Sequence, residues 1–323
     1  MPMFLHNYAI EFCFMHTSYQ KQNGGKNMKK IMALALALVL AMGTLTACGG
    51  STNNADQTND ADSTPAATTV KTIDINLTEE EYAFGVDKNQ PELLEAVNSF
   101  IAEIMSDGTF DEICNHYFGD GTPVAVTSAE LDASKDQLVV ATNAAFEPFE
   151  YTTGGTEYYG IDMEIAGLLA EKLGKELVIV NMDFDAVCLS VGQQQCDIAM
   201  AGLTINEDRK EYVNFSNPYY NASQKLIVMS DNTEYDACAD AAAIETILNS
   251  KDTAYRVGVQ TGTTGQFYCE GDADWGFAGF GVTTTGYKNG SLAVQDLLNG
   301  NLDCVIIDSA PAACIVEAIN AVQ

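Results

Sequence analysis

Apolar strands alternate with amphipathic helices from Gln137 to the end of the chain. The first set predicts strands at 137–142, 176–182 and 197–202 and helices at 160–174, 184–194 and 206–213. After residue 222 a second set predicts strands at 225–229, 256–260, 281–287 and 303–308, with a last helix at 310–322. Such alternation is typical of a mainly parallel sheet covered on both faces. The sequence therefore predicts an α/β fold of two lobes, each with flanking helices.

The segment before these sets has its own pattern. Residues 70–76 and 82–86 alternate like short strands. Pro91 opens a helix, and Gly108 ends it. Its apolar positions recur at helical spacing at Leu94, Val97, Ile101, Ile104 and Met105. A second helix is expected at 110–118, and residues 119–136 form a connector without a clear period.

Charge excludes one class of function. The 323 residues carry 15 Lys and Arg against 45 Asp and Glu, a net charge of -30, and 47% are hydrophobic. The hydrophobic content is enough for about two globular domains. Nucleic-acid binding is excluded, because it depends on clustered basic residues.

The N-terminal region is typical of an exported protein. Met28 and two lysines precede an apolar run that ends in small residues before Cys48, which predicts a signal peptide at 28–47. The sequence of residues 45–48, Leu-Thr-Ala-Cys, resembles a bacterial lipobox, so Cys48 is the expected lipid attachment. The alternative, a membrane helix, would be shorter than the roughly 20 apolar residues a span needs. We interpret residues 1–27 as lying upstream of the natural start and residues 48–69, polar and small, as a disordered tether.

Seven cysteines follow Cys48, an odd number without CxxC or Cys/His spacing. Several lie in apolar runs, where free Cys acts as a small hydrophobe. We expect mainly core thiols, with one disulfide left open, and neither a metal nor a cofactor.

Five motifs together resemble the extracellular amino-acid-binding proteins of ABC importers. They are VATNAAFEPFEY, GIDMEIAGLLAEKLG, DIAMAGLTINEDRKEYVNFSNPYY, VGVQTGTTG and VIIDSAPA, in this order over residues 137–323. The resemblance implies two α/β lobes joined by a hinge of two crossing strands, with a ligand clamped between them. It also implies permease subunits as partners, a monomer, and a place on the extracellular face of the membrane.

The order of segments departs from that family. Relatives continue after the DSAPA helix through a hinge strand into two helices that end near a sequence like SDGTFDEICNHYFG, which here occupies residues 106–119. The chain therefore resembles a circular permutant. Lobe 1 is expected at 81–222, with the connector at 119–136 joining the old C-terminal helices to the old N-terminal half. Lobe 2 is expected at 223–323 together with 70–80. The alternative is a relic of an upstream duplicate, but no motif recurs.

An amino acid presents a carboxylate and an ammonium, so its site needs a fork of donors and a buried acceptor. Arg209 follows the end of a strand on a helix that Asn206 is expected to cap. The resemblance makes Arg209 the carboxylate ligand and Asp308 the ammonium acceptor. A surface ion pair with Glu207 or Asp208 is the alternative for Arg209, and a helix cap is the alternative for Asp308.

The resemblance also assigns the other candidate ligand contacts. Gly202 and Thr204 would offer main-chain and hydroxyl contacts, and Thr263 and Thr264, with Gly262, a helix start that favours an anion. Phe146 and Phe184 would sandwich the ligand side chain. Glu150 and Asp162 are either ligand contacts or structural. Asn143 stands where relatives that select basic amino acids often carry Asp, so the expected ligand is a polar or basic amino acid.

Three functions remain open. The first is capture of a free amino acid for import, without covalent chemistry. The second is a dehydratase-like enzyme on the same fold; His116, the only histidine after Cys48, lies far from the cleft motifs, and no Ser/His or Cys/His constellation occurs. The third is a non-transporting sensor lipoprotein with the same site.

Overall fold

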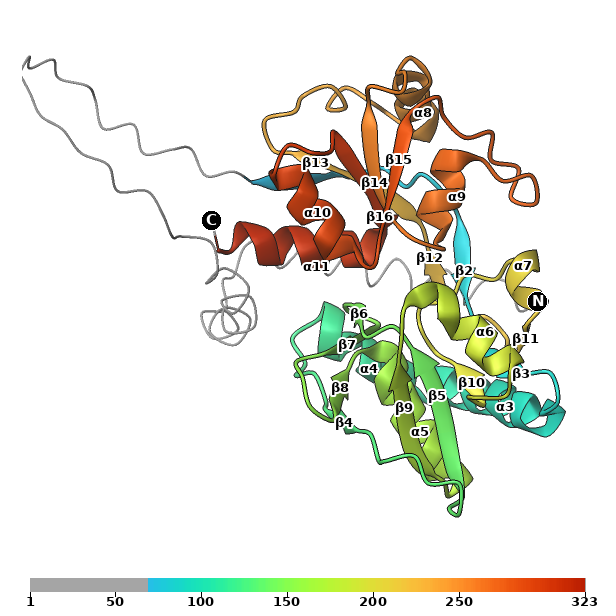
Figure 1. Cartoon of the computed structure of the whole chain (residues 1–323). Helices are drawn as coiled ribbons and strands as arrows, with labels where there is room; N and C mark the ends of the chain where they lie inside the picture. The colour runs from blue at the N-terminus through green and yellow to red at the C-terminus, as the bar shows by residue number, and fades with distance from the viewer. Residues whose placement is uncertain (1–68, 323) are drawn as a thin grey trace, which may run out of the picture.

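A computed structural model of the chain describes residues 69–322 (Figure 1). The segment 1–27, the signal peptide at 28–47, Cys48 and nearly all of the tether therefore lie outside the described residues. The described chain forms two α/β lobes, as Figure 1 shows, with the two parts joined in the middle of the molecule. The predicted fold class is confirmed.

The first lobe is built on a five-stranded sheet of order β11-β3-β10-β5-β9. Its strands are β3 (Gly85–Asp87), β5 (Gln137–Thr142), β9 (Glu176–Asn181), β10 (Ile198–Ala199) and β11 (Val213–Phe215). The helices of this lobe are α3 (Pro91–Asp107), α4 (Thr109–Phe118), α5 (Ile161–Leu173), α6 (Val187–Gly192) and α7 (Glu207–Lys210), with a 3-10 turn at Phe184–Ala186. A small antiparallel sheet adds β4 (Val126–Thr127), β6 (Ala145–Phe146), β7 (Glu150–Thr152) and β8 (Glu157–Tyr159).

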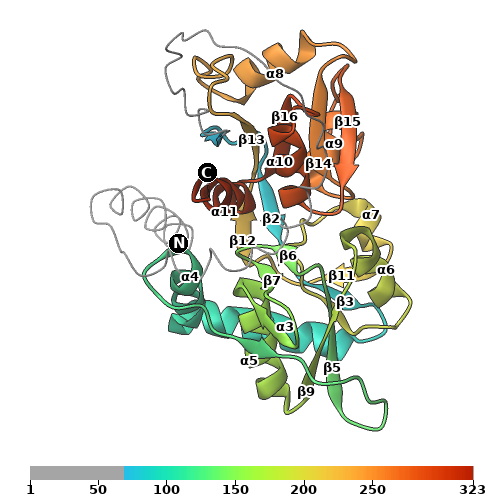
Figure 2. The ribbon, with the colours of Figure 1, turned by 60° about the vertical axis from the view of Figure 1, so that its left-hand side comes forward.

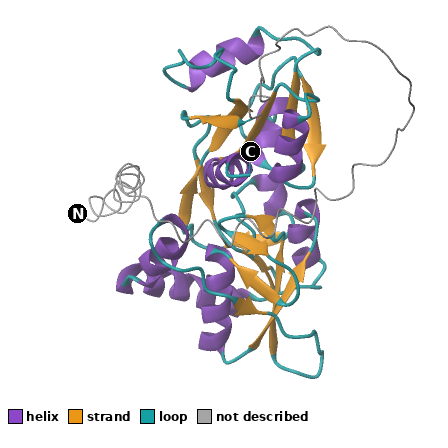
Figure 3. Cartoon of the chain, turned by 90° about the vertical axis from the view of Figure 1, so that its left-hand side faces the viewer, coloured by secondary structure: helices purple, strands orange, loops and turns teal. Residues whose placement is uncertain are grey.

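The second lobe repeats this plan with the order β1-β13-β16-β14-β15. Its strands are β1 (Val70–Ile73), β13 (Gln224–Met229), β14 (Arg256–Gln260), β15 (Thr283–Tyr287) and β16 (Cys304–Asp308). Its helices are α8 (Ala241–Asn249), α9 (Thr264–Glu270), α10 (Gly290–Leu298) and α11 (Ser309–Asn320). In each large sheet three neighbouring strands are parallel, and two further strands extend one side of the sheet through antiparallel pairings. Figure 3 shows helices outside the sheets in both lobes.

Two short strands cross between the lobes. They are β2 (Glu80–Tyr82) and β12 (Tyr220–Ala222), which pair antiparallel. Figure 2 shows this pair between the upper and lower lobes. The two-strand hinge expected from the resemblance is therefore present.

The segment after residue 69 contributes a strand to each of these three sheets. β1 pairs with β13, which pairs with β16, so the predicted strand at 70–76 lies in the same sheet as the strand ending at Asp308. β2 belongs to the hinge, and β3 pairs with β10 and β11 of the first lobe. The side chain of Asn320 receives a hydrogen bond from Val70 N at 3.1 Å and donates one to Val70 O at 2.8 Å. Residues 70–119 are therefore an integral part of the fold, and the two ends of the described chain are adjacent.

Several element boundaries differ from the prediction, and the strand expected at 197–202 is reduced to β10 (Ile198–Ala199). The strand expected at 82–86 is divided into β2 and β3, because the chain passes there from the hinge into the first sheet. The helix expected at 206–213 ends at Lys210, since Val213 pairs with Asp87 in the sheet. The connector contains β4, which pairs with β8. Its two residues are too short a pattern to read from sequence.

The helix boundaries at Pro91 and Gly108 are confirmed. Pro91 occupies the first turn of α3, where a missing N–H costs nothing. Gly108 ends the helix with a φ of 89°, a left-handed conformation that glycine adopts without strain.

None of the seven cysteines after Cys48, all of which lie within the described residues, forms a disulfide. Four of them, Cys188, Cys196, Cys269 and Cys304, are buried, which confirms the expectation of mainly core thiols. Burial raises the pKa of Cys304 to about 12, so this thiol stays protonated. Between residues 69 and 322 no helix is both long and apolar enough to cross a bilayer. The same part of the chain has no group of His, Cys, Asp or Glu arranged to hold a metal.

Candidate functional site

Arg209 is a buried cation at the boundary between the lobes. Asn206 caps α7, because its Oδ1 accepts a hydrogen bond from Arg209 N at 2.8 Å, as predicted. Arg209 is 9% exposed, and its guanidinium donates from Nη1 to Thr204 O at 2.6 Å and from Nη2 to Gly262 O at 3.0 Å. Its Cζ lies 5.1 Å from the centre of the Phe184 ring.

No carboxylate among residues 69–322 forms an ion pair with Arg209. The alternative expected from the sequence, a surface ion pair of Arg209 with Glu207 or Asp208, does not form among these residues. Glu207 pairs with Lys210 at 2.6 Å. The guanidinium thus has main-chain acceptors but no counter-charge, although buried charges in proteins are normally paired. A cavity beside it is lined by Phe184, Cys188, Gly262 and Phe267, among other residues.

The predicted contacts of the two lobes face one another. The Oγ1 atoms of Thr204 in lobe 1 and Thr264 in lobe 2 are 3.4 Å apart. Asn143 Oδ1 accepts from Gln260 Nε2 at 3.2 Å, and Asn143 Nδ2 donates to Met182 O at 2.7 Å. Thr263 precedes α9, and its hydroxyl donates to Gln260 O at 2.8 Å rather than capping the helix.

Asp308 is buried at the end of β16 and accepts a hydrogen bond from Tyr82 Oη at 2.5 Å. Its side chain makes no cap bond to α11, so the helix-cap alternative is not what the structure shows. Burial raises the pKa of Asp308 to about 7, and the charge of the neighbouring Glu80 adds to the increase.

Glu80 was missed by the sequence analysis and is central to the hinge. Its Oε2 accepts from Thr204 Oγ1 at 2.8 Å, while Oε1 accepts from Thr78 Oγ1 at 2.6 Å and from Gln224 Nε2 at 3.0 Å. The carboxylate therefore joins a candidate ligand contact of lobe 1 to the first strand residue of β13 in lobe 2. The alternation within β2 was the available signal, because Glu80 shares a face with Tyr82 two residues later.

Asp162 and Glu150 are two further buried carboxyls. Asp162 accepts from Gly202 N at 2.9 Å and from Tyr219 Oη at 2.5 Å, and burial raises its pKa to about 7. Glu150 is 0% exposed, and neither of its carboxyl oxygens has a hydrogen-bond partner in the described structure. Burial raises the pKa of Glu150 well above its ordinary value, and the charges of Asp162 and Asp308 raise it further.

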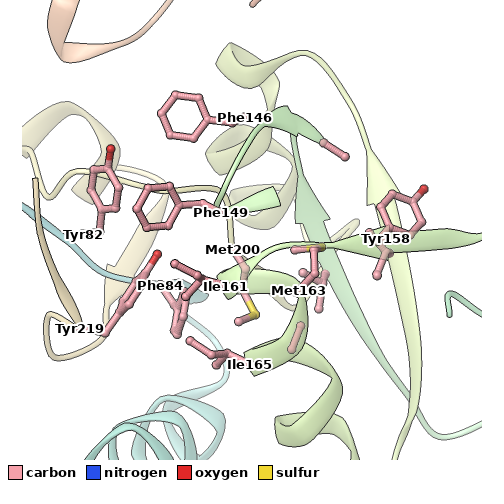
Figure 4. Close-up of a cluster of buried hydrophobic side chains, with 14 of the residues drawn as sticks. Tyr82, Phe84, Phe146, Phe149, Tyr158, Ile161, Met163, Ile165, Met200 and Tyr219 are labelled. Atoms are coloured by element: carbon pink, nitrogen blue, oxygen red, sulfur yellow. The ribbon is translucent and has the colours of Figure 1, made fainter. Parts of the chain in front are cut away.

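Aromatic rings border these carboxyls. Figure 4 shows Phe146, Phe149 and Tyr82 at one end of the core cluster, with ring centres of Phe146 and Phe149 6.1 Å apart and those of Phe149 and Tyr82 5.1 Å apart. Phe146 also lies against Gly202, where a Cβ would come within 2.9 Å of Phe146 Cε1. Phe184 instead lies against Arg209. The ligand sandwich between Phe146 and Phe184 stays a prediction.

His116 lies away from these groups. Its Nδ1 is 2.8 Å from Glu164 Oε2 on α5. The residues brought together around the hinge are therefore one guanidinium, four carboxyls, hydroxyls and aromatic rings.

Comparison with known proteins finds amino-acid-binding relatives. The L-arginine-binding protein of Pseudomonas aeruginosa is 26% identical over 186 residues, which is 58% of this chain and 66% of that protein. The ABC transporter arginine-binding protein 1 of Escherichia coli is 28% identical over 178 residues, 55% of this chain and 65% of that protein. The arginine-binding extracellular protein ArtP of Bacillus subtilis is 32% identical over 111 residues, 34% of this chain and 43% of that protein. The chain thus spans less than two thirds of the length of these relatives.

Among solved structures, an ancestral arginine-binding protein bound to glutamine is 31% identical, with a TM-score of 0.47, and the match covers 58% of this chain and 76% of that one. The sequence profile of the bacterial extracellular solute-binding proteins, family 3, matches residues 14–120 and 138–309. These two blocks make up most of the 323 residues. The chain therefore belongs to family 3 of the bacterial extracellular solute-binding proteins.

Proposed function

We propose that this protein binds a free amino acid, polar or basic, in the cleft between its lobes and delivers it to an ABC importer. The observation that carries the proposal is the buried guanidinium of Arg209, which has no carboxylate partner among residues 69–322. Family membership and the relatives named arginine-binding support the same class of ligand.

Arg209 would hold the ligand carboxylate. A guanidinium presents parallel N–H donors that match the two oxygens of a carboxylate. Thr204, Gly202, Thr263 and Thr264 would add hydroxyl and main-chain contacts. Because Arg209 already contacts Gly262 of the other lobe, a ligand bound here would touch both lobes and favour the closed form.

Asp308 would accept the ligand ammonium. It ends a strand at the interlobe face, and its carboxyl is buried with a tyrosine hydroxyl as its donor. A buried carboxyl with a raised pKa gains most from a cation placed beside it, since the pair removes the cost of an isolated charge.

We also propose the finer features of the family pattern. Cleavage before Cys48 and lipidation of its thiol would anchor a monomer to the extracellular face of the membrane, with the permease subunits as its partners. The site requires no cofactor. Labelling of growing cells with a radioactive fatty acid tests the anchor, and Cys48→Ala should abolish incorporation.

Circular permutation is the proposed explanation of the segment order, with lobes at 81–222 and at 223–323 plus 70–80. Two observations support it: β1, β2 and β3 each enter a different sheet, and the family match has two blocks separated by residues 121–137. The gap overlaps the proposed connector at 119–136.

A dehydratase-like enzyme is the second candidate function. The specific observation in its favour is the raised pKa of Glu150, since a protonated carboxyl can serve as a general acid. Recovery of the ligand after incubation separates the two functions. A binding protein returns it unchanged, and an enzyme returns a product.

The decisive experiment is titration calorimetry of the purified protein with the individual amino acids. We expect saturable binding of at least one polar or basic L-amino acid with one site per chain. The matched control is the amide of that amino acid, which has lost the carboxylate and should bind far more weakly. Absence of binding by every amino acid, or equal binding of the amide, would reject the proposal. Sensing without transport is distinguished by uptake assays in cells that lack the protein.

A further inference from the structure

Glu80 is a buried carboxylate that three uncharged side chains surround. It is 5% exposed, and its oxygens accept hydrogen bonds from the hydroxyls of Thr78 and Thr204 and from the amide of Gln224. No lysine or arginine between residues 69 and 322 forms an ion pair with it. A buried charge without a counter-ion depends on such donors. The three donors are therefore held in their orientation toward Glu80.

The backbone places this carboxylate behind the interlobe site. Strand β2 pairs with β12 across the hinge, and Glu80 and Tyr82 project from the same face of β2. Tyr82 is also bridged to Thr204, which brings the Thr204 side chain of lobe 1 next to that face. On the side of lobe 2, Thr78 and Gln224 are joined by a hydrogen bond from Gln224 N to Thr78 Oγ1 at 2.8 Å. Glu80 thus contacts lobe 1 through one oxygen and lobe 2 through the other.

The hydrogen bonds of this network run in one direction. A carboxylate only accepts hydrogen bonds, whereas a hydroxyl has one proton to donate and two lone pairs that accept. Thr204 donates its proton to Glu80 Oε2 at 2.8 Å. The Thr264 hydroxyl of lobe 2 lies 3.4 Å from Thr204 Oγ1, across the lobe boundary. Toward the cleft, the Thr204 hydroxyl can therefore only accept.

A side-chain amide in place of the Glu80 carboxylate would not fix this direction. An amide nitrogen can donate to Thr204, whose own proton would then turn away from the hinge. A donor would replace the acceptor that Thr204 presents to the cleft. Arg209 lies beside this position, since its Nη1 donates to Thr204 O at 2.6 Å. The carboxylate of Glu80 thus determines what a ligand meets next to the guanidinium.

We propose that Glu80 is a positioning residue of the hinge, which holds the Thr204 hydroxyl as a hydrogen-bond acceptor toward the cleft. The inference rests on the proposed function, because it names the residue that orients one of the proposed ligand contacts. Glu80 acts through Thr204, while its bonds to Thr78 and Gln224 fix the carboxylate against lobe 2. A ligand N–H then meets an acceptor that is already oriented, which reduces the entropy lost on binding.

The first test compares Glu80→Gln with the parent protein by calorimetry. The probes are L-arginine, a basic amino acid, and L-glutamine, a polar one. The substitution keeps the size of the side chain and frees the Thr204 hydroxyl to turn. Because hydrogen bonds to a charged ligand group are affected, affinity should fall about 10- to 100-fold. Unchanged affinity would overturn the inference and leave the proposed function intact.

Glu81→Gln is the matched control. This neighbouring glutamate lies on the exposed face of β2, so affinity should change by no more than about twofold. If the parent protein binds neither probe, any other polar or basic amino acid that it binds takes their place. A parent protein that binds none of them would reject the proposed function and the inference together.

Glu80→Asp provides a second variant if Glu80→Gln does not fold. It keeps the charge but withdraws the carboxylate by one methylene, so the bond to Thr204 should be lost and affinity should fall about tenfold. Circular dichroism and urea denaturation show whether each variant is folded. Parent affinity in folded Glu80→Asp, where Glu80→Gln does not fold, would overturn the inference.

A double-mutant cycle shows whether Glu80 acts through Thr204. Thr204→Val removes the hydroxyl, so nothing is left for Glu80 to orient. In that background Glu80→Gln should change affinity by no more than about threefold, against about 10- to 100-fold in the parent background. A glutamate with a purely structural role would cause the same loss in both backgrounds. Equal losses would therefore contradict the inference.

Thr78→Val separates positioning from stability. Thr78 donates to Glu80 Oε1 at 2.6 Å, so its loss leaves the buried carboxylate with one donor fewer and should lower the free energy of unfolding. Thr204 stays bound to Oε2, so affinity for the same amino acid should remain within about threefold. Urea denaturation and calorimetry measure the two effects. A loss of affinity as large as that in Glu80→Gln would show that the whole hinge network controls binding, and would overturn the assignment to the Thr204 hydroxyl.

Discussion

The hydroxyl of Tyr82, on the hinge strand β2, donates a 2.5 Å hydrogen bond to Oδ1 of Asp308, which is 226 positions later in the sequence. Both side chains are buried, and Tyr82 also packs against Phe149 and Tyr220. The bond therefore connects the hinge to the carboxyl proposed to receive the ligand ammonium. It also holds that carboxyl in place before a ligand arrives.

Tyr82→Phe should weaken the fold by removing this donor. The ring and its packing remain, but Asp308 Oδ1 loses its hydrogen bond in a buried place, a loss of about 1 to 3 kcal/mol in the free energy of unfolding. Urea denaturation of the ligand-free protein measures it. Tyr159→Phe is the control, since that hydroxyl is on the exposed side of β8 and bonds only weakly, at 3.3 Å, to Glu157. Unchanged stability in Tyr82→Phe would mean that the bond contributes nothing.

Arg209→Ala should impair binding severely. The substitution would leave the ligand carboxylate buried without its partner, a loss of about 2 to 5 kcal/mol. This corresponds to a loss of affinity of about 30-fold to several-thousand-fold. Arg209→Lys should recover only part, because an ammonium lacks the planar pair of donors. Calorimetry with the best ligand of the parent protein gives both values.

Arg256→Ala is the control for Arg209. Arg256 begins β14, at the opposite end of that strand from Gln260, and its Nε pairs with Asp303 Oδ2 at 3.1 Å. The ion pair is partly exposed and worth little. Affinity should therefore change little, and a larger loss at Arg256 than at Arg209 would contradict the proposed site.

The sequence predicts the two ends of the site but not its centre. Arg209 and Asp308 were assigned from motifs that resemble the family, and both lie just after strand ends, where α/β proteins bind ligands; their roles stay predictions. Glu80 could not be found this way, because its partners Thr204 and Gln224 are 124 and 144 positions away and meet it only through the hinge. Asp162 opens a helix with an apolar stripe, a position that is usually solvated, yet packing against Tyr219 buries it completely.

Acidic conditions should stabilise the ligand-free protein through Asp162 and Asp308. Burial raises the pKa of each carboxyl to about 7, from 3.8 in the unfolded chain. The folded state then binds the proton more tightly, so this contribution to stability is complete below about pH 4 and is lost as the pH rises to about 7. Within that window each group should lower the free energy of unfolding by about 1.4 kcal/mol per pH unit.

Denaturation of the parent protein and of Asp162→Asn from pH 5 to pH 8 tests this relation. The variant has no proton to bind at this position, so its stability should fall less steeply over the same range. Asp296→Asn is the control without an effect in this range: hydrogen bonds from Asn301 and Tyr287 lower the pKa of this carboxyl from 3.8, so it is ionised in both states above pH 5 and its removal should leave the slope unchanged. Equal slopes for the parent and Asp162→Asn would show that Asp162 is ionised throughout.

Cleavage of the connector should leave a folded binder. Residues 131–136 are exposed. The bonds that cross the position between Ala133 and Ser134 are local, such as Lys135 N to Asp132 O at 3.0 Å, whereas the bonds of Lys135 and Asp136 to Glu176 lie after it. Strand β4, which contacts β8, lies before a cut between Ala133 and Ser134, and β5 begins after it. A protease site inserted between Ala133 and Ser134 would allow calorimetry before and after cutting. Loss of binding on cutting would show that the connector is structural.

The strongest test of permutation is to reverse it. Asn320 on α11 holds the backbone of Val70 through two hydrogen bonds, so a short glycine linker can join the end of the described chain to its beginning. A protein that starts at Ser134, passes through this linker and ends at Ala133 keeps every strand pairing in place. We expect it to fold and to bind the same amino acid within about threefold, because no buried contact is cut. A second rearrangement that opens the chain between Val139 and Val140, in the middle of β5, should not fold. If the first rearranged protein also fails to fold, the present order is itself required for folding, and the segment 70–119 is more than a relocated C-terminal end.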